Sequence, residues 1–343
     1  MIRIKIEESA PELENEIYYL PQRPTYHSVI SEVYGGKFYY AKQFIHGEVS
    51  HILPFSVMSN PIFGKKIVSM PYDGSYGDVI RLKDYEPSDE LYMEILKYAE
   101  KNKIRYVEIR SRGENSILKR LGFEDDISLI ISEVNIEGVY SNPKFLRKRR
   151  KNNSLAQKYG VQVEISDNIN DLKRFYKIMS LNMRSYGTPM YPPSYFYQVW
   201  SSFHDQGNVV LIKGIYNGEM VSGLLLLFSG KNAVLKYSAT LNKYISKRLY
   251  PTMKWFAMDL CRERNCSILN MGTSFANDSG LIVAKEGLGA KTIPLVTYTK
   301  SLQGKSHPLS FYQNKYRVLI NLWKYQPLFL SQLLGGEFWR WYC

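Results

Sequence analysis

The chain has 343 residues and a formal net charge of +13, from 45 lysines and arginines against 32 aspartates and glutamates. Its 45% of hydrophobic residues exclude a disordered or fibrous protein, and its length predicts two domains, each with its own core. The longest apolar run, residues 223–228, is too short to cross a bilayer, and the first 20 residues lack a signal-peptide core. We therefore expect a cytoplasmic protein.

An internal repeat organises the sequence. Residues 36–49 and 207–220 share a pattern of strand, glycine turn and strand. Each half then continues with an amphipathic helix and a short strand, which are residues 91–99 and 105–109 in the first half and residues 253–261 and 267–271 in the second. The second copy carries about five extra residues just after its short strand, and insertions of this kind often build sites.

This order of elements predicts an α/β fold of mixed α+β sheets, arranged as two tandem domains. Residues 141–160 predict a polar linker helix that ends where Gly160 supplies a left-handed stop. We therefore place the domains at residues 1–145 and 146–300. Residues 301–343 combine basic with aromatic side chains, are too short for a domain, and are expected to pack back on the body.

Several short motifs follow one another in a characteristic order. They are Leu121-Gly122-Phe123 and residues 146–151, 182–189, 236–240, 270–274 and 285–290. With the duplication, they resemble the GNAT acyltransferase fold in its doubled form and, more narrowly, the Fem family of peptidoglycan-bridge aminoacyltransferases and the Fem-like proteins grouped with it. The likeness covers residues 25–335. It implies two tandem GNAT-like domains and the transfer of an acyl or aminoacyl group to an amine.

Two features depart from the family pattern. The family often has phenylalanine before the lysine and aspartate before the Met-Gly pair, where this chain has Ala284 and Asn270. The long helical hairpin that some Fem enzymes insert in the second half is missing.

Acyl transfer to an amine needs a surface for the anionic part of a substrate, a hydrogen-bond donor for the oxyanion and a group that takes the proton of the amine. Lys285 lies in the inserted segment, followed by Gly287 and Gly289, so we expect its ammonium in a concave site whose backbone amides are open to a phosphate. A solvated helix lysine is the alternative. The resemblance implies contact with a phosphate-bearing acceptor and makes Lys285 the first catalytic candidate.

Two more side chains are candidates on chemical grounds. Arg184 ends an amphipathic helix, where a guanidinium can bind phosphate or carboxylate, or can simply favour the helix dipole. Tyr237 follows an apolar strand, and alternation predicts that it points away from Lys236 and Ser238. Its hydroxyl can serve as an oxyanion donor or proton relay, with core packing as the alternative.

Polar residues at a strand end and a run of cations complete the predicted site. Asn270 and Ser274 flank Gly272, where they can orient a substrate or cap a turn. The linker helix carries a cationic cluster that can bind nucleic acid or another anion, or can form a solvated face. The cluster contains Arg147, Lys148, Arg149, Arg150 and Lys151.

No resident cofactor or metal is expected. The three cysteines, Cys261, Cys266 and Cys343, have neither the spacing nor the neighbouring histidines of a metal site. The glycine-rich stretch at residues 71–78 lacks the features of a phosphate loop and predicts a groove rim or an ordinary turn. Neither half has the glycine pattern that grips the pyrophosphate of CoA, which favours another activated donor, although acetyl-CoA and aminoacyl-tRNA both remain possible donor substrates.

The sequence thus predicts a Fem-like transferase that joins an acyl or aminoacyl group to an amine on a phosphate-bearing or cell-envelope precursor. An acyl-CoA-dependent N-acetyltransferase is one alternative. Another is a non-catalytic protein that binds tRNA or a membrane surface, which the cationic cluster and the aromatic residues in 311–343 favour. Peripheral contact with a membrane is compatible with the enzymes and with the binding protein. The sequence does not indicate an oligomeric state.

Overall fold

The computed structural model describes residues 2–9, 19–60, 64–72, 75–303 and 317–342. The first half contains β1 (Ile2–Glu7), α1 (Pro24–Tyr34), β2 (Lys37–Ile45), β3 (Glu48–Asn60), β4 (Gly64–Val68), β5 (Ile80–Arg81), α2 (Asp89–Lys101), β6 (Tyr106–Arg112), α3 (Ser116–Arg120) and β7 (Glu124–Asn135). The second half contains α4 (Ile136–Tyr140), α5 (Pro143–Lys158), β8 (Val161–Ser166), α6 (Ile169–Tyr186), α7 (Pro193–Phe203), β9 (Val209–Tyr216), β10 (Glu219–Ser229), β11 (Asn232–Thr240), α8 (Leu249–Glu263), β12 (Ile268–Phe275), α9 (Ser279–Glu286) and β13 (Ala290–Ser301). Two helices, α10 (Arg317–Tyr325) and α11 (Leu328–Tyr342), follow.

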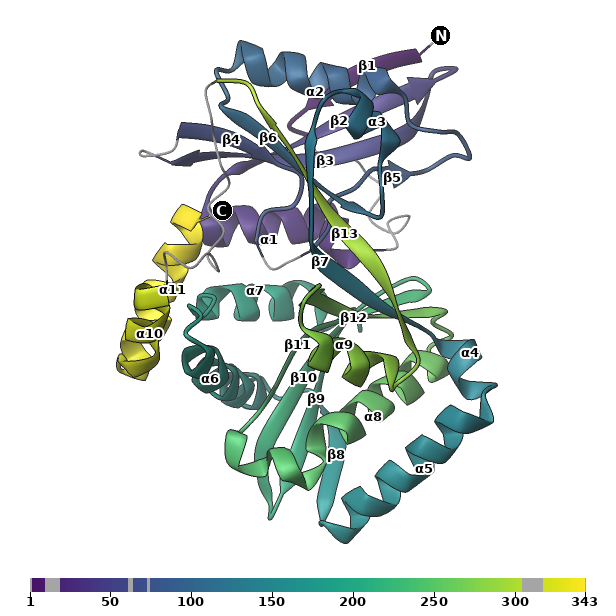
Figure 1. Ribbon diagram of the computed structural model, residues 1–343, viewed down its shortest axis with the longest axis vertical. Coiled ribbons are helices and arrows are strands. Elements are labelled where there is room, and N and C mark those ends of the chain that lie inside the picture. Colours follow the sequence, from purple (N-terminus) through teal and green to yellow (C-terminus); the bar gives the residue numbers. More distant parts are fainter. Residues whose placement is uncertain (1, 10–18, 61–63, 73–74, 304–316, 343) are drawn as a thin grey trace.

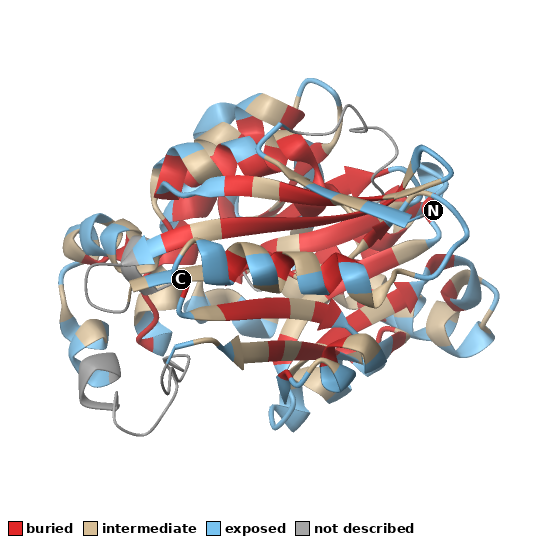
Figure 2. Cartoon of the chain, turned by 90° about the horizontal axis from the view of Figure 1, so that it is seen from above, coloured by how far each residue is buried: buried red, intermediate tan, exposed pale blue. Residues whose placement is uncertain are grey.

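The strands form one mixed sheet that runs through both halves of the molecule (Figure 1). Within the described residues the order is β1-β2-β3-β4-β6-β13-β7-β12-β11-β10-β9-β8, with β5 paired to β3. The buried strands lie between helices whose outer faces are exposed (Figure 2). The structure thus has the mixed α/β architecture that the element order predicts.

The two halves repeat the same hairpin. β2 and β3 are joined at His46 and Gly47, and β9 and β10 are joined at Asn217 and Gly218. All four residues have positive φ angles, of 53°, 88°, 52° and 76° in that order. A two-residue turn with both φ angles positive is the type that matches strand twist, which explains why glycine occupies the second place in both copies.

The last strand of each half lies against the other half. β13 pairs with β6 of the first half, with Tyr298 opposite Ile109, and with β7 on its other side. β7 in turn pairs with β12 of the second half. Figure 1 shows β7 and β13 running side by side between the two halves. The strand pairing therefore crosses the boundary expected at residues 145 and 146.

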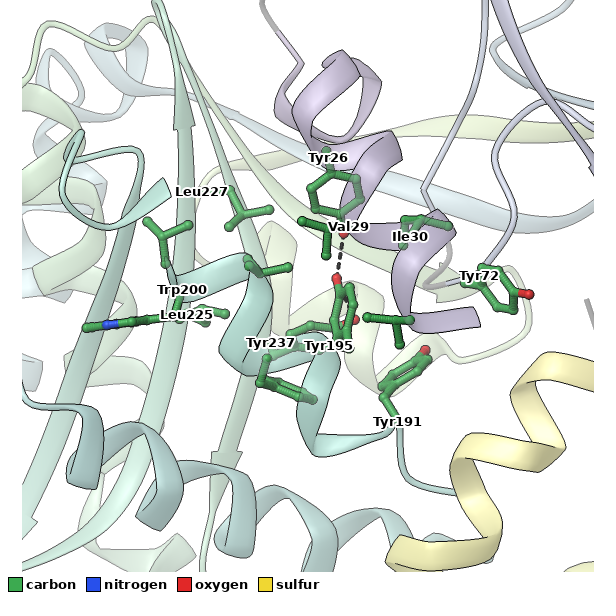
Figure 3. Packing of buried hydrophobic residues seen from close by; sticks show 14 of the residues in the cluster. Tyr26, Val29, Ile30, Tyr72, Tyr191, Tyr195, Trp200, Leu225, Leu227 and Tyr237 are labelled. Carbon is green, nitrogen blue, oxygen red and sulfur yellow. Dashed lines mark hydrogen bonds between the residues drawn. The ribbon is translucent and has the colours of Figure 1, made fainter. Parts of the chain in front are cut away.

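Three apolar cores stabilise this arrangement. Under α2, Leu91 and Ile95 pack with residues that include Tyr298 of β13. A second core lies between α8 and the strands of the second half. The third core contains residues of α1, α6 and α7 and joins the halves, with Tyr26 and Tyr195 at its centre (Figure 3). Each buried aromatic side chain removes a large apolar area from water, so this shared core resists separation of the halves.

The C-terminal helices pack on the second half. The ring of Trp339 in α11 stacks on Tyr191 with centroids 4.8 Å apart, and its Nε1 donates to the carbonyl of Pro189 at 3.1 Å. The opposite surface of these helices leaves Phe329 and Leu333 exposed. Over the described part of the chain, none of the helices has the length and apolar character that a membrane span requires.

Gly223 in β10 provides a stability test of the second half. A Cβ atom at this position would overlap the buried ring of Phe175 in α6, so Gly223→Ala should lower the free energy of unfolding by about 1–3 kcal/mol. Gly280→Ala is the matched control, because among the described residues the nearest atom to its Cβ is Asp278 Oδ1, at an ordinary contact distance of 3.8 Å. Urea titration of both variants measures the difference, and equal midpoints would contradict this packing.

Candidate functional site

A cavity of about 320 Å³ lies where β11 and β12 separate. The two strands pair in parallel only between residues 232–234 and 268–270. Beyond these residues, the register of β12 against its other neighbour, β7, shifts between Asn270 and Thr273. Gly272, within this shift, adopts a φ angle of 76°. Backbone groups that the sheet leaves unpaired at such a divergence can bind a substrate.

Residues of both halves line this cavity. Tyr19, Ser75 and Tyr76 of the first half face β11 and β12 of the second. The Nζ of Lys236 in β11 donates to Ser75 Oγ at 2.7 Å, which links the halves directly across the cavity.

A second cavity of about 350 Å³ continues from the first. Tyr19, Tyr76 and Asn270 line both spaces, and the rings of the two tyrosines stack with centroids 4.0 Å apart. The second space also contains the ion pair between Arg112 and Glu133, with a shortest distance of 2.6 Å. The two cavities therefore meet at the stacked tyrosines and Asn270.

Lys285 occupies the last turn of α9 and lines the first cavity. Only 3% of the residue is exposed. Its Nζ lies 2.9 Å from the carbonyl oxygen of Gly272, 3.3 Å from that of Thr273 and 2.8 Å from Ser274 Oγ. Burial, reinforced by the positive charge of Lys254, lowers the pKa of Lys285 to about 8, against a smaller opposing effect of Asp278.

Ser274 contacts the Lys285 ammonium, and Asn270 lines the same cavity as Lys285. Both side chains are buried. Asn270 Oδ1 accepts a hydrogen bond from the amide of Gly272 at 2.8 Å, and this bond holds the bend of β12. Ser274 Oγ accepts a hydrogen bond from the Lys285 ammonium. Asn270 thus stabilises the backbone of β12, and Ser274 helps to hold Lys285 against that strand.

Tyr237 lines the cavity and is the first member of a hydroxyl chain. Its hydroxyl lies 3.4 Å from that of Tyr195, which lies 2.5 Å from that of Tyr26. Figure 3 shows these rings converging between α1, α7 and β11. Tyr237 therefore connects the cavity to the tyrosines that hold the two halves together.

The orientation predicted for Tyr237 holds relative to Ser238. The Tyr237 hydroxyl lies 3.4 Å from that of Tyr195 in α7, whereas the Ser238 side chain hydrogen-bonds to Tyr250 in α8, on the other face of the sheet.

Lys236, Tyr237 and Ser238 all line the cavity because β11 forms part of its wall. The pairing register of β10 with β11 shifts between Leu225 and Leu226, next to Lys236, so the alternation is interrupted there. Lys236 is a site residue that the sequence does not reveal, because a bulge of this kind has no local signature.

Three predicted site residues have other partners. Arg184 does not line the cavity, and its Nη1 donates to the carbonyl of Gln326 at 3.4 Å, next to α10. The amide of Gly287 donates to Val283 and that of Gly289 to Glu286, at 2.8 Å and 2.9 Å. These two amides end helix α9 and are not available to a phosphate, contrary to the expectation from sequence.

The predicted cationic cluster lies on α5, which follows β7 and α4 at the lower edge of Figure 1. Arg149 is paired with Asp259 of α8 at 2.6 Å, and the Lys148 ammonium donates to the carbonyl of Gly287 at 3.2 Å. Arg147, Arg150 and Lys151 are exposed. None of the five lines the cavity, so any anion they bind contacts a separate surface.

The lining of the first cavity is unusually poor in acids. It contains Lys236 and Lys285 but no aspartate or glutamate among the described residues. Over the same part of the chain, no three histidine, cysteine or acidic side chains lie close enough together to hold a metal ion. A lining with lysines and no described acid attracts anions.

Comparison with known proteins shows which domain and fold the chain shares. Residues 144–278 match the family described as Acetyltransferase (GNAT) domain. No curated protein matches the chain. Among solved structures, FemX is similar with a TM-score of 0.68 and 16% identity, over 87% of this chain and 97% of that one.

Two further solved structures share the fold. One is the C-terminal domain of a putative lysylphosphatidylglycerol synthetase from Agrobacterium fabrum, with a TM-score of 0.55 and 12% identity over 74% of this chain and 81% of that one. The other is a tandem GNAT protein from the clavulanic acid biosynthesis pathway. Its TM-score is 0.51 and its identity 9%, over 79% of this chain and 85% of that one.

The fold and the matched domain define the class of protein. The chain has a tandem GNAT fold, and its second half carries a GNAT acetyltransferase domain. The GNAT acetyltransferase domain over residues 144–278 supports an acyltransferase, as the resemblance seen in the sequence implies.

The buried Lys285 should make stability depend on pH. Its pKa is about 8 in the folded chain against 10.5 for an ordinary lysine, so the unfolded chain binds more protons between these values and stability rises with pH. Relative to Lys285→Met, the wild-type protein should gain about 2 kcal/mol of unfolding free energy between pH 7 and pH 10. Urea titration of both proteins at the two pH values measures this gain, and a constant difference would contradict the burial of the charge.

Proposed function

We propose that this protein transfers an acyl or aminoacyl group from an activated donor to an amine, within the cavity between β11 and β12. The observation that carries the proposal is the position of Lys285, Lys236 and Tyr237 around one space whose described lining has no carboxylate. A phosphate-bearing or cell-envelope precursor is the acceptor that suits such a space, because its phosphate would be attracted by the lysines.

The described residues suggest how the site acts. Lys236 and Lys285 provide the positive field that attracts an anionic substrate. Tyr237 supplies a hydroxyl close to the point where β11 and β12 separate, suited to stabilise an oxyanion or to relay a proton. Asn270 holds the bend of β12 and so fixes the distance between Lys285 and the strand.

Two comparisons support an aminoacyl donor. FemX and the putative lysylphosphatidylglycerol synthetase share the fold over most of this chain, and the name of the second indicates transfer of lysine to a lipid. A donor of this kind agrees with the lack of a CoA-binding glycine pattern in the sequence.

Replacement of Lys285 tests the proposal. In an assay of aminoacyl-tRNA or acyl-CoA donors with nucleotide-linked amine acceptors, Lys285→Met should lower kcat/KM by about 100-fold or more, since a charge next to the reacting atoms is lost. The melting temperature should stay within a few degrees of wild type. Lys291→Met is the matched control, because this lysine is exposed on β13. A wild-type rate in Lys285→Met would refute the assignment.

An acyl-CoA-dependent N-acetyltransferase is the second candidate. The family that matches residues 144–278 is described as an acetyltransferase, and this description favours CoA as the donor carrier. Titration calorimetry with CoA decides between the two donors. Saturable binding with a Kd in the micromolar range would establish the CoA enzyme, whereas an absence of heat at millimolar CoA would favour aminoacyl-tRNA.

A further inference from the structure

The second cavity has a carboxylate in its lining. Glu133 in β7 supplies it, and among the described residues it is the only aspartate or glutamate that lines either cavity. Its side chain is 10% exposed. The first cavity, by contrast, has Lys236 and Lys285 in its lining. The two joined spaces therefore differ in charge, because the first attracts anions and the second contains a group that can bind a cation.

The backbone places Glu133 where the two cavities meet. In the antiparallel pairing of β7 with β12, Glu133 lies opposite Asn270, which lines both cavities. Residues that lie opposite each other in such a pair have their side chains on the same face of the sheet, with Cβ atoms about 4.5–5.5 Å apart. The carboxylate thus lies one strand away from the bend of β12 that contacts Lys285.

An ion pair holds the Glu133 carboxylate in a fixed orientation. Arg112 in β6 donates from Nε to Oε1 at 2.9 Å and from Nη2 to Oε2 at 2.6 Å, across the intervening strand β13. A bidentate pair of this kind sets the plane of the carboxylate and uses one acceptor position on each oxygen. An ionised carboxylate has about four such positions, so Glu133 keeps acceptor positions for a ligand.

The other charged groups close to this cavity bind protein partners. Arg81 lines the cavity and forms a bidentate pair with the exposed Glu86, at 3.0 Å and 2.9 Å. The carboxylate of Asp78 does not line the cavity, and it accepts a hydrogen bond from Ser111 Oγ at 2.5 Å. Among the described acids of this region, the one that meets a ligand in the cavity is therefore the partner of Arg112.

The rest of the lining suits a hydrocarbon chain. The stacked rings of Tyr19 and Tyr76 form the wall that the two cavities share. The second cavity also has apolar side chains in its lining, from Val79, Ile80, Ala233, Val234 and Ile268. Contact with such side chains favours an amine on an alkyl chain over a small hydrated cation.

We infer that the second cavity binds the amine end of the acceptor, as a primary alkylammonium paired with the Glu133 carboxylate. This assignment rests on the proposed transferase function, in which the amine must reach the junction of the cavities while an anionic group occupies the first. A charge-assisted hydrogen bond between ammonium and carboxylate is stronger than a bond between neutral groups. Glu133 thus determines acceptor specificity, because a methyl group in place of the amine leaves the carboxylate without this donor.

Direct binding tests this assignment without turnover. The probes are a capped peptide, acetyl-Ala-Lys-Ala-amide, and the same peptide with norleucine in place of lysine, which removes the amine. Saturation-transfer NMR measures both dissociation constants. The wild-type protein should bind the lysine peptide about 10-fold more tightly or better, and Glu133→Gln should remove this preference, since a charge-assisted bond is lost. Equal affinities in the wild-type protein would overturn the assignment.

Two variants separate a ligand contact from a structural effect. Glu108→Gln breaks a matched pair in β6, between Glu108 and Arg110 at 2.7 Å, that lines neither cavity, so it should keep the wild-type preference. Arg112→Gln breaks the same ion pair as Glu133→Gln but leaves the carboxylate, so the lysine peptide should still bind more tightly. Loss of the preference in either variant would mean that ion pairs only stabilise the fold here, and would overturn the contact with the amine.

A kinetic measurement separates this assignment from the proposed function. In the transferase assay, Glu133→Gln should raise the KM of the amine acceptor by about 10-fold or more and leave the KM of the donor unchanged. Turnover with an unchanged acceptor KM would overturn the role of Glu133 while leaving the transferase intact. A preference for the amine that depends on Glu133, without turnover on any donor, would refute the proposed transfer and, with it, the acceptor role of this amine.

Discussion

The antiparallel pairing of β7 with β13 is the constraint on which the rest of the structure depends. Each strand follows the other strands of its own half in the sequence, yet β13 lies against β6 and β7 lies against β12. A sheet edge without its partner strand exposes unpaired amides and carbonyls. Neither half therefore has a complete sheet without the other, and the cavity between them has walls whose relative position is fixed.

The chemistry of the site follows from where this sheet opens. β11 and β12 stop pairing after three residues, and the bend of β12 directs two carbonyl oxygens at Lys285. The same wall shields the lysine from water, and electrostatic interactions are stronger in such surroundings than at a surface. A buried amine that reaches the cavity can attract an anion or exchange a proton, whereas an exposed lysine would do both less effectively.

Much of the fold could be predicted from local patterns. The repeated hairpins, the amphipathic helices of both halves and the polar helix ending before Gly160 all depend on residues close in sequence. The same holds for the cluster of Asn270, Ser274 and Lys285, which lies on one strand and the helix that follows it. Contacts of this kind need no knowledge of distant parts of the chain.

Other features could not be found in this way. Lys236 shares the cavity with Tyr237 because of a bulge against β10, and Arg184 is drawn to Gln326, which lies far along the chain. Tyr19 and Tyr76 enter the site from the first half, through a stacked pair that has no motif. Each of these positions depends on contacts between segments separated by many residues.

The amino-acid sequence by itself determined the class of fold, the duplication and the candidate lysine, because turn chemistry, periodicity and motif order act over a few residues. Only the tertiary structure decided that the last strands cross between the halves, that Lys285 is buried and that Lys236 lines the same cavity. The reason is physical: burial and the electric field at an amine depend on every group packed around it, and those groups come from strands and helices distant in the chain.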